Sequence, residues 1–329
     1  MILNHLVDHL VKRNVKFVLL KDVRCPELRK EKAVEHTIVM SSSVSARHKY
    51  YRAHRNDFSS VLCLGNVPPT IKLNVPVHTY IHNLSLLKIP KDYSLKKKII
   101  SQFKQWFIRY YASNTDTWIV QTDTTRHIVN KVLNSGNKNI FIYPFYYIPE
   151  DIFQKPLSER EDFCFIGEYT HAKGHEYLIE AWRLLASKGF YKKLHLTVSE
   201  PSIVSLINEA AKDGADIDNH GYISFNEVVD IYNKCTATIY PSLNESLGLG
   251  IIEAAEAGCD VIGCNLPYMF SVCKPSQHFE PHCPESIVDA VLSYETNKNK
   301  TKLIIKDKVE EFIDFLLERH SKVHSLQQN

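Results

Sequence analysis

Three kinds of segment are missing from this 329-residue sequence, and each absence argues against one class of protein. No apolar run is long enough to span a membrane, so we expect no transmembrane helix. The first residues, MILNHLVDHLVKR, lack the basic-then-apolar order of a secretory signal, and their leucine and valine spacing predicts an amphipathic helix. No known nucleic-acid-binding motif occurs, which argues against a nucleic-acid partner. We expect a cytoplasmic protein, because the cysteines described next are typical of reduced thiols.

Closely paired cysteines are also missing, because the chain has eight cysteines but no C-x-x-C pair. Most lie in apolar segments, as Cys63 and Cys164 do, and we interpret them as reduced core residues. A metal site near Cys273, His282 and Cys283 is conceivable, but their spacing lacks the pattern of metal ligands. We therefore assign none of these residues to a metal site.

The net charge is small, at +3, but the two halves of the chain differ in sign. Residues 1–150 hold 23 Lys and Arg against 10 Asp and Glu, whereas residues 151–329 hold 17 against 27. The basic first half could meet an anionic partner, or the solvated faces could simply differ in sign. Within it, the segment KIPKDYSLKKKIISQFKQWFIRYY places lysines near Trp106 and Phe107. This segment suits a peripheral membrane surface, and a core-facing helix with solvated lysines explains it equally well.

Apolar residues recur with strand and helix periods in turn along the chain. Strands are predicted over residues 15–20, 36–40, 61–65, 75–83, 116–122, 138–145, 162–169, 193–200, 217–223, 236–242 and 259–264. Helices are predicted over residues 2–13, 42–57, 94–112, 123–133, 174–189, 201–214, 224–235, 249–258 and 304–326.

This alternation predicts an α/β protein with parallel sheets, organised as two Rossmann-like domains that face each other across a cleft. The domains are expected over residues 1–150 and 151–329, with the last helix, 304–326, packing back on the first domain. Ligands of such sheets bind outside the carboxyl ends of the strands. The segments IHNLS, GEYTHAKG and ESLGLG are therefore expected on the cleft side.

The segment NESLGLGIIEA places a carboxylate on each side of a glycine-rich turn that opens a helix. Gly248 and Gly250 allow a tight turn and a close approach of the backbone to a ligand. The free amides and positive dipole end of the helix suit a phosphate. Glu253 must face another part of that ligand, for which ribose hydroxyls are a good candidate, and Glu245 can reach the opposite end. This arrangement suits a nucleotide-sugar, although glycine turns with a nearby glutamate also open many ordinary helices.

Three segments of the second half resemble the signatures of family 4 glycosyltransferases, which are retaining enzymes of GT-B architecture. They are FIGEYTHAKGHEYLIEAW, GYISFNEVVDIYNKCTATIYPS and PSLNESLGLGIIEAAEAGCDVIG. In the first half, IHNLSLLKIPKDYS resembles the segment that carries the cleft histidine of the family, and CLGNVPP and IVQT resemble the subgroup that builds bacterial surface polysaccharides of O-antigen type. The resemblance covers nearly the whole chain and is more specific in the second half.

The resemblance implies a role for each matching residue. Lys173 would pair with the donor diphosphate, and the backbone of Leu249, Gly250 and Ile251 would hold the same phosphates. Glu253 would bind the ribose, and Ile223 would lie near the base. The remaining two residues, His82 and Glu245, would lie at the transferred sugar near the reacting carbon. Tyr222 would also lie near the base, although ordinary packing explains it better.

The sequence departs from the family at two places. Glu168 stands where the family has an arginine facing the diphosphate, so we expect this carboxylate to turn away or pair with a base. The family also opens with a central strand and a glycine-rich loop, whereas here Met1 leads directly into the first predicted helix. The resemblance therefore implies an incomplete first domain, either because the true start lies upstream or because the chain is a shortened relative.

The resemblance implies transfer of a sugar from a nucleotide-sugar, such as a UDP- or GDP-sugar, to a hydroxyl group with retained anomeric configuration. The expected acceptor is a lipid-linked saccharide of surface polysaccharide biosynthesis, met at the cytoplasmic face of the inner membrane. No cofactor and no divalent metal are expected, because cations of the Lys173 type and a helix N-terminus offset the leaving diphosphate. Two alternatives are a non-catalytic donor-binding or scaffold relative that partners an active transferase, and another GT-B enzyme such as an epimerase.

Overall fold

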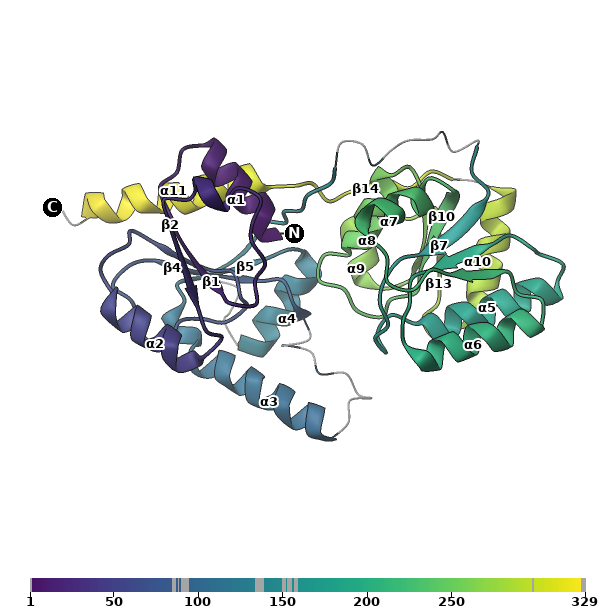
Figure 1. The fold of residues 1–329 in the computed structure, drawn as a ribbon, viewed down its shortest axis with the longest axis horizontal. Helices are drawn as coiled ribbons and strands as arrows, with labels where there is room; N and C mark the ends of the chain where they lie inside the picture. The colour runs from purple at the N-terminus through teal and green to yellow at the C-terminus, as the bar shows by residue number, and fades with distance from the viewer. Residues whose placement is uncertain are drawn as a thin grey trace. The chain divides into compact units, whose positions relative to one another are not determined.

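The computed structural model divides the chain into two compact units. It describes residues 2–84, 87, 89, 95–133, 139–149, 152, 156, 159–297 and 299–326, with side chains up to residue 318. Unit 1 comprises Met1–Tyr147 together with Lys306–Asn329, and unit 2 comprises Ile148–Ile305 (Figure 1). The division lies close to the boundary predicted at residue 150. Lys88 and Lys91 of the basic segment lie outside the described residues.

Unit 1 contains two separate parallel sheets. One has the order β1-β2, and the other has the order β3-β4-β5-β6. The strands are β1 (Val18–Asp22), β2 (His36–Met40), β3 (Val61–Cys63), β4 (Val77–Ile81), β5 (Thr117–Val120) and β6 (Ile140–Ile142). The helices are α1 (Ile2–Lys12), α2 (Val44–Ala53), α3 (Leu95–Tyr110), α4 (Asp123–Leu133) and α11 (Val309–Leu326), with short 3-10 turns at Glu31–Ala33 and Ala112–Asn114.

The last helix, α11, lies beside α1 and belongs to the core of unit 1 (Figure 1). Phe312 is fully buried and stacks on Phe145, with ring centroids 5.3 Å apart. On the outer side, the Arg13 guanidinium donates a hydrogen bond to the Asp314 carboxylate at 2.6 Å. The helix begins at Val309 and not at the predicted residue 304, because the backbone amide of Ile304 donates to the Val272 carbonyl in unit 2.

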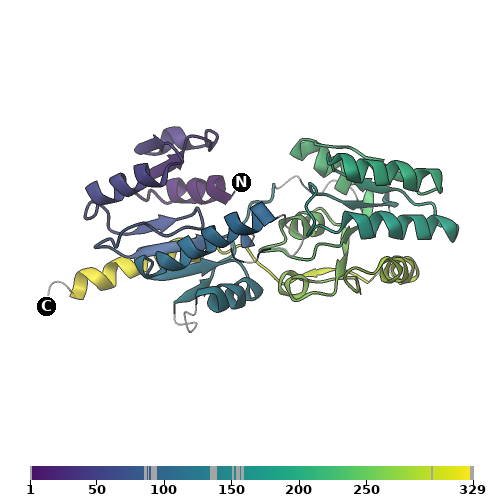
Figure 2. The ribbon, with the colours of Figure 1, turned by 90° about the horizontal axis from the view of Figure 1, so that it is seen from below.

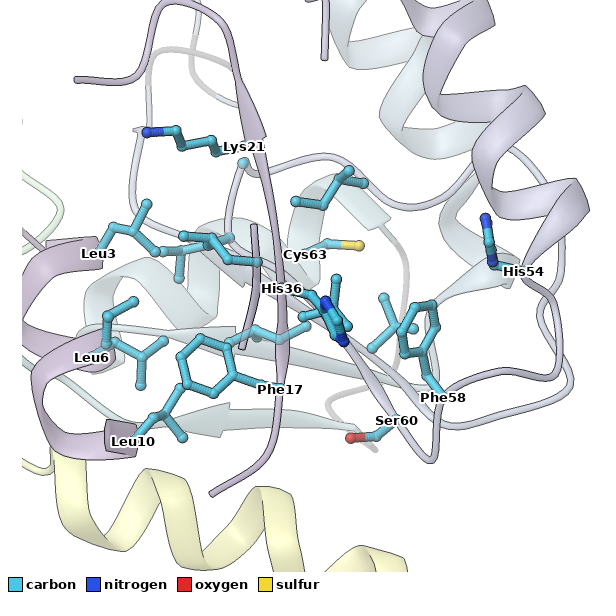
Figure 3. Close-up of a pocket in the computed structure, with 18 of the residues that line it drawn as sticks. Leu3, Leu6, Leu10, Phe17, Lys21, His36, His54, Phe58, Ser60 and Cys63 are labelled. Atoms are coloured by element: carbon cyan, nitrogen blue, oxygen red, sulfur yellow. The ribbon is translucent and has the colours of Figure 1, made fainter. Parts of the chain in front are cut away.

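A cavity of about 710 Å³ lies where the two sheets of unit 1 are separated (Figure 3). It is bordered by β1 and β3, and among the described residues β1 pairs only with β2 and β3 only with β4. Each of these strands therefore has one edge without a strand partner. We call this space the edge cavity; its lining is largely apolar and includes Leu3, Leu6 and Leu10 of α1, Phe17, Phe58 and Cys63.

The edge cavity bears on the expectation of an incomplete first domain. In a doubly wound sheet of order 3-2-1-4-5-6, the first strand lies between the second and the fourth. The break between β1 and β3 falls at the corresponding place in unit 1. The sheet is thus interrupted where the family resemblance expects a central strand, and the functional consequence of that interruption stays a prediction.

Unit 2 is built on one continuous sheet of order β13-β11-β10-β7-β8-β9, all of whose pairs are parallel. Its strands are β7 (Asp162–Phe165), β8 (Leu194–Leu196), β9 (Ile217–Asn219), β10 (Cys235–Tyr240), β11 (Asp260–Cys264) and β13 (Gln277–Phe279). Its helices are α5 (His175–Ser187), α6 (Pro201–Lys212), α7 (Phe225–Tyr232), α8 (Leu249–Glu256), α9 (Pro267–Val272) and α10 (Pro284–Thr296), and a small antiparallel pair joins β12 (Cys273–Lys274) to β14 (Lys302–Leu303).

The parallel α/β architecture predicted from the sequence is confirmed in both units, and strands alternate with helices along the chain (Figure 2). Six of the eight cysteines are buried and all eight are free thiols, as the core interpretation expects. Among the described residues, no helix combines the length and the low polarity that a membrane span requires.

Candidate functional site

Two loops meet at the carboxyl ends of β7 and β10 in unit 2. Gly174 adopts φ 70°, and a Cβ atom built on it would lie 2.7 Å from the Pro241 carbonyl oxygen. The backbone amide of Leu243 donates a hydrogen bond to the Ala172 carbonyl at 2.7 Å. Only glycine satisfies both the positive φ and the close backbone approach at position 174. The contact fixes the loop that carries Lys173 against the loop that carries Glu245.

Lys173 and Glu245 form an ion pair at this junction. The Lys173 ammonium lies 2.7 Å from the nearer Glu245 carboxylate oxygen, and the side chains are only 23% and 15% exposed. The Tyr240 hydroxyl donates to the same carboxylate oxygen at 3.2 Å. The family resemblance implies that Lys173 binds the diphosphate and Glu245 the sugar, but it does not predict the contact between the two side chains. An incoming phosphate would compete with Glu245 for the lysine.

The N-terminus of α8 lies next to this pair. Gly248 is the N-cap residue with φ 71°, and a Cβ on Gly250 would lie 3.3 Å from the Tyr240 ring. The Ile251 amide donates to the Gly248 carbonyl, whereas the described residues offer no acceptor to the amides of Leu249 and Gly250. Free amides at a positive dipole end favour an anion. Of the three backbone positions predicted to hold phosphate, two thus present free donors.

Glu253 lies one helical turn further along α8 and is half-buried. Burial raises the pKa of its carboxyl group to about 7. None of the described residues donates a hydrogen bond to this carboxylate or forms an ion pair with it. A half-buried acid without a partner is costly, so the site suits a ligand that supplies hydroxyl donors.

Glu168 turns toward the loop after β8. The Ser199 hydroxyl donates to its carboxylate at 2.9 Å, and the Tyr169 amide donates to it at 3.3 Å. We expected Glu168 to turn away or to pair with a base, and its described partners are a hydroxyl and backbone amides. Near the predicted base position, Ile223 packs against the core cluster of α7, but Tyr222 is 87% exposed, so the packing interpretation of Tyr222 is wrong.

His175 is a buried residue of the site that sequence analysis did not single out. Its ring Nε2 lies 3.1 Å from the Gly167 carbonyl oxygen, so it can donate a hydrogen bond there. Burial lowers the pKa of this histidine to about 4, and the ring is therefore neutral at pH 7. Its position directly after Gly174, at the start of α5, was the available signal.

His82 lies in unit 1, directly after β4. Asn66 holds it in place, because the Asn66 side-chain oxygen accepts a hydrogen bond from the His82 amide at 2.7 Å. The side-chain amide of Asn66 also lies 3.3 Å from the His82 ring Nε2. Burial lowers the pKa of His82, which favours a neutral ring. Asn66 adopts φ 64°, a conformation that asparagine tolerates better than most residues, and the sequence analysis missed it.

Known proteins resemble this chain in sequence and in fold. Residues 148–310, which include all of unit 2, match the family model described as glycosyl transferases group 1. A curated relative, an uncharacterized glycosyltransferase of Methanocaldococcus jannaschii, is 22% identical over 275 residues, which cover 78% of this chain and 68% of the relative.

Solved structures of the same fold include three that cover most of this chain. Sucrose-phosphate synthase from Thermosynechococcus elongatus has a TM-score of 0.68 at 15% identity, with 89% of this chain and 83% of that chain covered. TarM has a TM-score of 0.61 at 19% identity. The match covers 85% of this chain but only 59% of TarM. The apo form of the lipopolysaccharide outer core galactosyltransferase WaaB has a TM-score of 0.62 at 12% identity. The match covers 91% of this chain and 86% of that chain. The fold is therefore that of the GT-B glycosyltransferases.

Proposed function

We propose that this protein is a retaining glycosyltransferase of family 4 type that takes its sugar from a nucleoside diphosphate sugar. The observation that carries the proposal is the grouping of Lys173, Glu245 and the free amides of α8 around one point of unit 2. A cation and free amides suit a diphosphate, and the unpartnered carboxylate of Glu253 suits the ribose hydroxyls. A crystal structure of a TarM mutant in complex with UDP shows that this relative binds such a nucleotide.

In this proposal, the bond between the anomeric carbon and the diphosphate breaks, and its electron pair leaves with the phosphate oxygen. The acceptor hydroxyl forms the new bond on the same face of the sugar and gives its proton to the leaving diphosphate. Lys173 and the amides of Leu249 and Gly250 offset the charge of the leaving group, so the step needs no divalent cation. When Lys173 binds the diphosphate, Glu245 is released to accept hydrogen bonds from the sugar. The family resemblance assigns His82 of unit 1 to the same sugar.

The proposed acceptor is a lipid-linked saccharide, and helix α3 supports it. Five of its large apolar side chains are at least half exposed and recur at helical spacing: Leu95, Ile99, Phe103, Trp106 and Tyr110. The helix also carries four lysines. An exposed apolar stripe with flanking cations is typical of a helix that lies in a membrane interface. This exposure argues against the alternative of a core-facing helix, and it fits an acceptor presented at a membrane surface.

The diphosphate assignment is tested by comparing ligands. We expect Lys173→Ala to weaken binding of UDP or GDP at least tenfold while changing the affinity for the nucleoside by less than twofold, because only the diphosphate contacts the lysine. Isothermal titration calorimetry measures both, and Lys188→Ala, an exposed lysine of the same unit, is the matched control. Equal losses for diphosphate and nucleoside would contradict the assignment.

The proposed absence of a divalent cation from the transfer step is tested separately. We expect sugar transfer to persist in the presence of a metal chelator.

A further inference from the structure

A second group of chemically active side chains lies in unit 2 at the edge of the sheet. His195 on β8 pairs directly opposite Asp218 on β9. His220 directly follows β9 and lies two residues after Asp218. Residues two apart on a strand share a face of the sheet, so His220 and Asp218 point the same way. The fold thus brings three potential metal ligands together from two neighbouring strands.

The ligand atoms of these residues face one another. The His195 Nδ1 and His220 Nε2 atoms are 2.9 Å apart. A carboxylate oxygen of Asp218 lies 3.8 Å from the first nitrogen and 3.7 Å from the second. Tetrahedral zinc at about 2.0–2.1 Å from each nitrogen needs ligand atoms about 3.3 Å apart. The observed separations lie on both sides of that value, so small side-chain movements suffice.

The contact on the opposite side of the His195 ring sets the tautomer of the neutral ring. Its Nε2 lies 3.0 Å from a carboxylate oxygen of Asp162 on β7, and this ring is almost fully buried. A carboxylate accepts, so Nε2 carries the proton and Nδ1 presents a lone pair toward His220 and Asp218. A carboxylate behind a histidine is the arrangement that commonly orients metal-bound imidazoles.

We propose that His195, Asp218 and His220 bind one divalent first-row transition metal ion, with zinc as the best match, and that Asp162 positions His195. The ion takes the place of the proton that now bridges the two rings, and that proton moves through solvent to Nδ1 of His220, so that both imidazole rings stay neutral. Asp218 and His220 are partly exposed, which leaves a fourth position for water. Two nitrogens and one carboxylate suit zinc or cobalt, whereas magnesium prefers an all-oxygen site.

The site is separate from the proposed transfer step. Its ligands come from the strands β8 and β9 and the residue after them, whereas Lys173, Glu245 and α8 follow β7 and β10. The bound ion would tie β8 to the segment that leads into Gly221 and Tyr222. Its expected effect is on the stability of this edge of unit 2, and diphosphate binding should not require it.

Calorimetric titration of the chelator-treated chain with zinc chloride tests the proposal. We expect one zinc ion per chain, no detectable binding of magnesium, and a cobalt complex with visible absorption but without a thiolate charge-transfer band. Asp218→Asn and His220→Gln should each weaken zinc at least tenfold, and Asp162→Asn should weaken it about 10–100-fold through the orientation of His195. These positions are preferred to the buried His195, whose replacement threatens folding.

The matched control is His278→Ala, which removes an exposed histidine elsewhere in unit 2 and should leave zinc affinity unchanged. Circular dichroism checks that each variant is folded. A wild-type chain that takes up no zinc would overturn the proposal. So would zinc binding that is equal in the wild type, Asp218→Asn and His220→Gln, since the ion would then sit on other ligands.

Discussion

At the scale of single residues, the environment of Glu253 disfavours a charge. Its carboxyl group is half-buried on α8, and its raised pKa of about 7 has burial as its cause. The folded protein therefore holds the carboxyl proton more tightly than the unfolded chain does, whose ordinary value is 4.5. Ribose hydroxyls would replace the missing donors, which ties the stability of the free protein to the ligand it is proposed to bind.

We predict that Glu253→Gln removes a pH dependence of stability. In the wild type, the stabilising effect of the bound proton is complete below pH 4.5 and is lost as the pH rises through 7, a change of about 3 kcal/mol in the free energy of unfolding. Urea unfolding of both proteins between pH 4.5 and 8 measures it. Parallel stability curves would show that Glu253 does not titrate as expected.

Glu253→Ala should also weaken nucleoside diphosphate binding by about 1–3 kcal/mol.

The residue types of the site could be predicted from the sequence, but their partners could not. The glycine turn and its two glutamates are local features, and Lys173 stands in a recognisable segment. The ion pair of Lys173 with Glu245 joins residues 72 positions apart, so only the folded sheet brings them together. The same holds for the pairing of Glu168 with Ser199 and for the His195 cluster, since strand register sets both.

Among the elements, α3 is the one whose apolar face is most exposed. Ile108 is buried and anchors the helix in the core of unit 1, while Trp106 is 54% and Phe103 62% exposed. A core-facing stripe and a membrane-facing stripe have the same helical period, because periodicity alone does not tell what covers a face. The burial pattern resolves that ambiguity in favour of an exposed face.

We predict that α3 carries binding to anionic lipid. Replacing Phe103 and Trp106 together by alanine should reduce cosedimentation with phosphatidylglycerol-containing vesicles at least fivefold, because the helix loses the side chains that would enter the interface. Tyr191→Ala, which removes a 71% exposed aromatic ring of unit 2, is the matched control. Equal sedimentation of the wild type and the double variant would exclude this helix as the contact. Added salt should weaken the wild-type interaction through the lysines.

Element boundaries were predicted best where a capping signal is local. The capping box of Ser224 and Glu227 was identified in the sequence and is present at the start of α7. The last helix was predicted too early, since the apolar pair Ile304 and Ile305 continues a helical pattern but its amides bond to Val272. Neither a helix nor a strand was predicted within residues 265–303, where short elements such as α9 and β12 are defined by contacts distant in sequence.

At the scale of the whole molecule, the two units differ in the continuity of their sheets. The sheet of unit 2 has six strands in one parallel array, whereas the described strands of unit 1 are divided between two smaller sheets. Unpaired strand edges and a cavity reduce the backbone and packing interactions that resist local opening. Unit 1 should therefore open locally at a lower free-energy cost than unit 2.

We predict that limited proteolysis cuts unit 1 before unit 2. Early cleavage sites should gather before residue 150, and residues 160–300 should persist as a fragment that UDP or GDP protects further. Mass spectrometry of the fragments, taken with and without nucleotide, maps the order of cleavage. Uniform resistance of both units would show that the divided sheet carries no penalty. Cleavage that begins in residues 160–300 would show that the assignment of the stable unit is wrong.

The edge cavity also affects how the protein behaves in concentrated solution. Within the part of the chain that the structure describes, β1 and β3 each have one edge without a strand partner, and such edges can pair with a strand of another molecule. Self-association of this kind grows with concentration even when each monomer is correctly folded. The yield of soluble protein should therefore depend on how fast the chain is made and how strongly it is concentrated, and unit 2 produced alone should be free of that limit.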